Sequence, residues 1–90
     1  MSKVKFTHAL KRFFPDLKAL EVKAEDVSEL MDQVESLFPG INSYVLDDQG
    51  ALREHVNIFV DGDLIYDRQH LSDKIKSNSE VYIMQALSGG

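Results

Sequence analysis

The 90-residue sequence has no cysteine, no tryptophan, only two prolines and no apolar run of membrane-spanning length. The absence of cysteine excludes a disulfide framework, a cysteine-ligated zinc site and a thiol nucleophile. The start of the sequence lacks the apolar run of a signal peptide, so we expect a cytoplasmic protein. A hydrophobic content of 43% suits one compact domain that folds without disulfides or a metal.

Positive charge is also scarce. The chain has 10 Lys and Arg residues against 15 Asp and Glu residues, which gives a formal net charge of -5. The average field of such a chain repels nucleic acid and anionic membranes, so we expect neither as a partner. A basic partner surface is favoured, although solubility alone is a sufficient reason for an acidic surface.

Candidates for metal binding and catalysis are few. His8, His55 and His70 are far apart in sequence, and nothing places them with carboxylates at metal-ligand spacing. Asp61-Gly62-Asp63 is explained by turn chemistry, because it lacks the ligand register and closing Glu of an EF-hand. No nucleophile, base and orienting group form a recognisable arrangement. We therefore expect no metal site, no catalytic residue and no bound cofactor.

Two segments near the start have the period-2 alternation of strands with one buried face. Val4, Phe6 and His8 alternate with Lys and Thr residues. Leu20 and Val22 alternate with charged residues in the same way. We expect this second strand to pair antiparallel with the first.

A helix is predicted after the second strand. Asp26 stands at the N-cap position with Glu29 three residues later, and the apolar residues of 27–38 follow helical i, i+3, i+4, i+7 spacing. Pro39-Gly40 ends the helix, because proline cannot continue it and glycine suits the left-handed residue that often closes it. Glu35 belongs to the opposite, polar face, which we expect to be solvated.

Residues 54–60 predict a third strand, in which every second residue from Val56 faces the core and Phe59 faces the other side. Asp61-Gly62 is a tight-turn signal, because both residues tolerate positive φ. A short strand near residues 64–66 is expected to pair back across this turn.

The last predicted strand covers residues 80–86. Val81 and Ile83 can join the core, whereas Tyr82 and Met84 then lie on the opposite face. The order strand, strand, helix, strand, short strand, strand predicts an α+β fold in which a mixed sheet of four to five strands packs on one main helix. The β-grasp is the simplest fold of this kind.

We expect residues 1–86 to form the domain and residues 87–90 to form a flexible tail. The tail consists of Leu87, Ser88, Gly89 and Gly90. Four extended residues reach about 13 Å, and glycines without side chains can pass through a narrow channel. The terminal carboxylate is a poor acyl donor until a nucleotide phosphate is joined to it, and the sequence has no Gly-rich phosphate loop, so another enzyme would have to bind the ATP. The alternative is that the tail is only a frayed end.

Several segments together carry a family resemblance. They are Phe38-Pro39-Gly40, Leu46-Asp47, the stretch 52–62 that reads LREHVNIFVDG, and the closing Gly89-Gly90. Through them the sequence resembles the MoaD/ThiS family of ubiquitin-like sulfur carriers. The resemblance implies a β-grasp fold in which Gly90 is adenylated by a ubiquitin-activating-type enzyme and then converted to a thiocarboxylate. ATP and a sulfur donor would act through that enzyme, with no cofactor bound to this chain.

The resemblance also implies a docking surface on the sheet near the last strand, which corresponds here to Met84, with Phe59 and Tyr82 beside it. The implied partners are the adenylyltransferase and a sulfur-acceptor synthase subunit or other thiotransfer enzyme, in a molybdopterin-type or related pathway. Close relatives of the molybdopterin-synthase subunit often carry proline before the tail, and this sequence has none there, which leaves the acceptor open. Conjugation to lysines as a protein modifier and a non-catalytic interaction domain are the alternatives.

Overall fold

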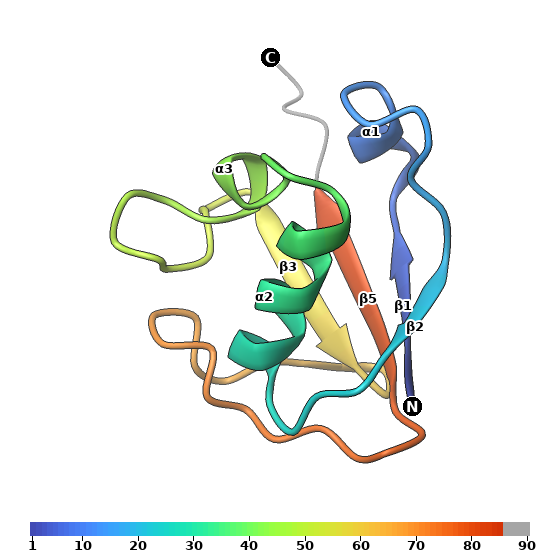
Figure 1. The fold of residues 1–90 in the computed structure, drawn as a ribbon. Coiled ribbons are helices and arrows are strands. Elements are labelled where there is room, and N and C mark those ends of the chain that lie inside the picture. The colour runs from blue at the N-terminus through green and yellow to red at the C-terminus, as the bar shows by residue number, and fades with distance from the viewer. Residues whose placement is uncertain (86–90) are drawn as a thin grey trace.

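The computed structural model describes residues 1–85 of the chain (Figure 1). Its elements are β1 (Ser2–Phe6), α1 (His8–Lys11), β2 (Leu20–Val22), α2 (Val27–Leu37), α3 (Asn42–Val45), β3 (Val56–Val60), β4 (Asp63–Leu64) and β5 (Glu80–Gln85). The sheet order is β2-β1-β5-β3-β4, with β1 and β5 parallel and the other neighbours antiparallel. α2 lies across one face of the sheet (Figure 1). The predicted α+β arrangement of a mixed sheet on one main helix is confirmed.

The core lies between α2 and the sheet. Every second residue of the long strands is buried there, because side chains alternate between the two faces of a strand. The buried strand residues are Val4 and Phe6 in β1, Val56 and Ile58 in β3, and Val81 and Ile83 in β5. The apolar stripe of α2 supplies Val27, Leu30, Met31 and Val34. The other residues of these strands face away from α2.

The two ends of α2 are held by side chains. Asp26 is the N-cap, and its carboxylate accepts a hydrogen bond of 2.8 Å from the backbone N–H of Glu29, as predicted. After the helix, Gly40 has φ +99°, which only glycine adopts without strain. The carboxylate of Glu35 accepts hydrogen bonds from the N–H groups of Gly40 (2.8 Å) and Asn42 (2.9 Å). These bonds lower the pKa of Glu35, so this side chain of the polar face also satisfies backbone N–H groups after the end of the helix.

The first strand is shorter than predicted. β1 ends at Phe6, and His8 opens α1 instead of continuing the strand. The ladder persists only through Thr7, whose N–H donates to the carbonyl of Ile83 at 3.1 Å. The physical reason is Leu10, which the helical turn places fully inside the core.

The hairpin of β3 and β4 has the predicted tight turn. Asp61 has φ +51° and Gly62 has φ +91°, the left-handed pair that matches the twist of two-residue hairpins. β3 starts two residues later than predicted, at Val56, and the short strand is Asp63–Leu64. Ala86, the last residue of the final predicted strand, lies outside the described residues.

A long connection from β4 to β5 is organised around Asp67. Its carboxylate accepts hydrogen bonds from the hydroxyl and N–H of Ser72 and from the N–H groups of Gln69 and His70. This loop presses Leu71 into the core, where that residue is 3% exposed. The bonds, led by that from the Ser72 hydroxyl, lower the pKa of Asp67 from 3.8 to about 2.

Asp67 should therefore make folding pH-dependent in acid. Because its pKa is depressed in the folded state, its contribution is complete above the unfolded value of 3.8 and is lost as the pH falls toward 2. Asp67→Asn should lower the free energy of unfolding at pH 7 and flatten its decline across that window, as measured by urea unfolding. Asp48→Asn is the control, because Asp48 is exposed and accepts no hydrogen bond within residues 1–85. Equal declines in the wild type and the Asp67 variant would contradict this account.

Candidate functional site

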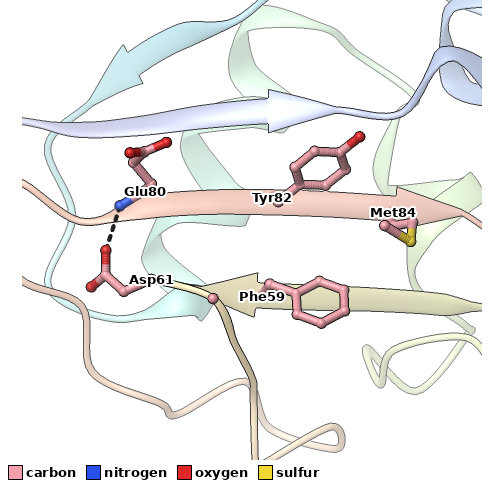
Figure 2. A pocket seen from close by; sticks show the side chains of 6 residues that line it. Phe59, Asp61, Glu80, Tyr82 and Met84 are labelled. Carbon is pink, nitrogen blue, oxygen red and sulfur yellow. Dashed lines mark hydrogen bonds between the residues drawn. The ribbon is translucent and has the colours of Figure 1, made fainter.

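The face of the sheet opposite α2 carries an apolar surface. On β5, Tyr82 and Met84 alternate with the buried Val81 and Ile83, so they point away from the core. Phe59 of β3 lies directly opposite Tyr82 in the antiparallel pairing of these strands. Figure 2 shows the Phe59, Tyr82 and Met84 side chains on neighbouring strands. The fold thus brings together the three residues predicted as a docking surface.

A shallow hollow lies on this face, and we call it the open-face hollow. It is lined by Phe59, Asp61, Gly62, Glu80, Tyr82 and Met84 (Figure 2). Tyr82 is 37% exposed and Leu64, which pairs with Phe59 across the β3–β4 hairpin, is 51% exposed. Leu64 therefore extends the apolar surface to the edge of the sheet. Exposed apolar side chains gathered on one face of a small domain are a feature of sites that bind another protein.

One end of the hollow is acidic. Asp61 and Glu80 are held together because the N–H of Glu80 donates to the Asp61 carboxylate at 2.9 Å and the N–H of Asp61 donates to the Glu80 carbonyl at 2.8 Å. The Glu80 backbone bond, followed by one from the Ser79 hydroxyl, lowers the pKa of Asp61. Lys5 lies 3.2 Å from the Glu80 carboxylate in an exposed ion pair. The hollow therefore grades from apolar residues to the Asp61 carboxylate, beside which Glu80 is already paired with Lys5.

Part of this site was not predicted from the sequence. Asp61 was expected only as a turn residue, and Glu80 and Leu64 only as strand residues. A signal was present, because a two-residue turn at Asp61-Gly62 places Phe59 opposite Leu64. The contact between Asp61 and Glu80 links residues 19 apart in sequence and has no local signature.

The predicted tail residues fall outside the part of the chain that the structure describes. They are Gly90, Gly89, Ser88 and Leu87. In the part of the chain that the structure describes, no three His, Asp or Glu side chains gather as a metal site would require. Over the same residues, no helix is both long and apolar enough to cross a bilayer.

The arrangement is chemically suited to binding. Within residues 1–85, the Asp61 carboxylate is engaged by the backbone of Glu80, and the Glu80 carboxylate is paired with Lys5. The rest of the lining is aromatic, thioether or backbone. Such a surface can accept an apolar side chain of a partner and favour a cation at its acidic end.

The model of the ThiS family matches residues 4–90, which is nearly the whole sequence. The chain belongs to the ThiS family. No match was found among curated proteins.

Solved structures similar to this ThiS-family chain have the same fold. A chain of the BexX/CysO complex of Amycolatopsis orientalis is 24% identical with a TM-score of 0.85, and the match covers 100% of both chains. CysO of Mycobacterium tuberculosis is 20% identical with a TM-score of 0.83, covering 97% of this chain and 100% of that one. The small archaeal modifier protein 1 of Methanosarcina acetivorans is 22% identical with a TM-score of 0.78, covering 99% and 95%. These likenesses identify the fold as the ubiquitin-like β-grasp.

Substitutions at the neighbouring residues Tyr82 and Ile83 of β5 should differ sharply in their effect on the free energy of unfolding. Ile83→Ala should cost about 2–5 kcal/mol, because it opens a cavity under α2 at a fully buried position. Tyr82→Thr should cost less than about 1 kcal/mol, because Tyr82 lies on the uncovered face and threonine suits a strand. Urea unfolding of the two variants measures both values. A large loss of stability for the Tyr82 variant would show that the open face serves folding.

Proposed function

We propose that this ThiS-family chain is a sulfur carrier whose Gly90 carboxylate is adenylated and converted to a thiocarboxylate. The observation that carries the proposal is the family match, which runs to residue 90 and therefore includes the closing Gly89-Gly90. The family and the ubiquitin-like fold support a sulfur carrier or a protein modifier. The thiocarboxylate and its use in cofactor or metabolite biosynthesis, of the molybdopterin type or a related pathway, are the finer part of the proposal.

The chemistry would need only the carboxylate from this chain. In the first step a carboxylate oxygen attacks the α-phosphate of ATP, and pyrophosphate leaves. In the second step a hydrosulfide attacks the acyl carbon, AMP leaves, and the proton of the nucleophile is released. The product is the thiocarboxylate, in which sulfur replaces one oxygen. Because the sequence has no cysteine, no side-chain thiol can hold the transferable sulfur, and the carboxyl end would carry it.

The open-face hollow supports a protein partner. Its apolar lining of Phe59, Tyr82 and Met84 suits an apolar side chain, and the Asp61–Glu80 end suits a cation. The similar CysO chain was solved as a complex with BexX, which supports the same use of this fold. We propose a ubiquitin-activating-type adenylyltransferase and a sulfur-acceptor synthase subunit or other thiotransfer enzyme as the partners. We propose that the activation of this chain and the transfer of its sulfur take place in the cytoplasm.

A second candidate is protein modification, in which an amine of a lysine attacks the activated Gly90 in place of sulfur. The likeness to the small archaeal modifier protein 1 favours it. Its signature would be Gly-Gly remnants on the lysines of cellular proteins after proteolysis. A non-catalytic interaction domain is the third, and its partner binding would survive removal of both glycines.

Loading of the carrier can be measured directly by intact mass. With the activating enzyme encoded by the same genome, ATP and sulfide, the wild type should gain the mass difference between sulfur and oxygen. Removal of Gly90 should abolish this gain and leave the urea midpoint unchanged, because the change lies beyond β5. An unmodified wild type in the presence of an enzyme that is active on ATP would refute the carrier proposal.

The hollow can be tested through the affinity for that enzyme. Met84→Glu should raise the KM for the carrier in ATP–pyrophosphate exchange about tenfold or more, because a charge replaces an apolar contact. Met84→Leu is the matched control and should stay close to the wild type. Equal KM values for the two variants would show that Met84 lies outside the interface.

A further inference from the structure

A second exposed aromatic surface lies away from the open-face hollow. The rings of Phe13 and Tyr44 are stacked, with centroids 4.6 Å apart and an interplanar angle of 23°. Phe14 meets the same Tyr44 ring edge-on at 5.5 Å. Phe13 is 53% exposed and Tyr44 is 36% exposed. We call these three residues the aromatic end surface.

The aromatic end surface is held by ordered backbone. The N–H groups of Phe13 and Phe14 both donate to the carbonyl of Leu10, a fully buried residue. Tyr44 belongs to α3, whose Val45 is also fully buried. The buried residues Leu10 and Val45 therefore fix the backbone on which the exposed rings are stacked. A half-exposed phenylalanine gains little from folding, so its stacked position favours a role in binding.

The surface is bordered by unpaired positive charge. Lys11 and Arg12 are exposed and lie directly before Phe13. The ion pairs within residues 1–85 are Lys5–Glu80 and Asp67–His70. No carboxylate of those residues therefore forms an ion pair with Lys11 or Arg12. This is a local reversal of charge in a chain whose net charge is -5. It is also opposite in sign to the acidic end of the open-face hollow.

The aromatic end surface lies at the end of the domain where β5 finishes. The N–H of Gln85 donates to the Thr7 hydroxyl at 3.1 Å, and Thr7 is the N-cap of α1. Figure 1 shows the end of β5 on this side of the molecule, with α1 and α3 near it. A segment of five residues, such as 86–90, spans at most about 18 Å even when fully extended. An enzyme that reacts with Gly90 must therefore come close to this end of the domain.

We infer that the aromatic end surface is a second docking site for the activating enzyme, beside the entrance to its active site. The inference rests on the proposed function and names the chemistry of that partner. The enzyme would present an apolar side chain against the Phe13–Tyr44 stack and carboxylates against Lys11 and Arg12. The open-face hollow would then bind the enzyme's basic and apolar residues, while the end surface binds acidic ones. This opposite polarity fixes the orientation in which the carboxyl end enters.

Kinetics of ATP–pyrophosphate exchange with the full chain test the inference. Phe13→Ser and Arg12→Glu should each raise the KM for the carrier about tenfold and leave kcat within about twofold, because each removes a docking contact and leaves the reacting carboxylate unchanged. The Arg12 effect should shrink at high salt, whereas the Phe13 effect should persist. Tyr66→Ser is the control, because Tyr66 is 95% exposed and makes no aromatic pair within residues 1–85.

Photo-crosslinking gives an independent readout. p-Benzoylphenylalanine at position 13 should crosslink to an acidic segment of the enzyme, whereas the same group at position 66 should not. Unchanged KM values for both variants, or equal crosslinking from the two positions, overturn the inference and leave the proposed function standing. If the wild type itself supports no exchange with an enzyme that is active on ATP, the proposed function fails and this inference fails with it. Urea midpoints close to the wild type show that the variants are folded.

Discussion

The parallel pairing of β1 with β5 is the constraint on which the rest of the structure depends. It joins the first and last strands at the centre of the sheet, with Val4 beside Val81 and Phe6 beside Ile83. Parallel neighbours require a long crossover, and here the intervening chain supplies it, including the helix that covers the core. The same pairing brings Thr7 to Gln85, so the end of β5 is held beside α1.

This crossover places α2 on one face of the sheet. The alternate residues of the same strands point to the other face, where no helix or strand of residues 1–85 covers them. Because side chains alternate along β5, each residue of this strand either packs in the core or points to the opposite face. Ile83 stabilises the fold, whereas Tyr82 and Met84 remain free within the described domain to contact another protein. The separation of the two roles explains how a domain of this size keeps both a stable core and an exposed apolar surface.

The open-face hollow and the aromatic end surface also differ in the sign of the charge beside them. The Asp61–Glu80 pair gives the open-face hollow an acidic end, and Lys11 with Arg12 gives the aromatic end surface a basic border. Neither feature follows from the net charge of -5, which is an average over the chain. A partner that contacts both surfaces would meet opposite charges at fixed positions relative to the end of β5. Orientation, more than affinity, is what such an arrangement contributes.

The sequence by itself determined the features that depend on near neighbours along the chain. The N-cap at Asp26, the turn at Asp61-Gly62 and the two-sided pattern of β5 were all predicted, because each is set within a few residues by backbone geometry and alternation. Those patterns were sufficient for the α+β fold and for the Phe59–Tyr82–Met84 face.

Only the tertiary structure decided the contacts between distant residues. It ended β1 before His8 so that Leu10 could be buried, and it placed the Asp61 carboxylate against the N–H of Glu80. It also stacked Phe13, which follows α1, on Tyr44 of α3, although the two residues are far apart in the sequence. Local propensity carries no information about such pairs, because their free energy depends on which segments the packed core brings together.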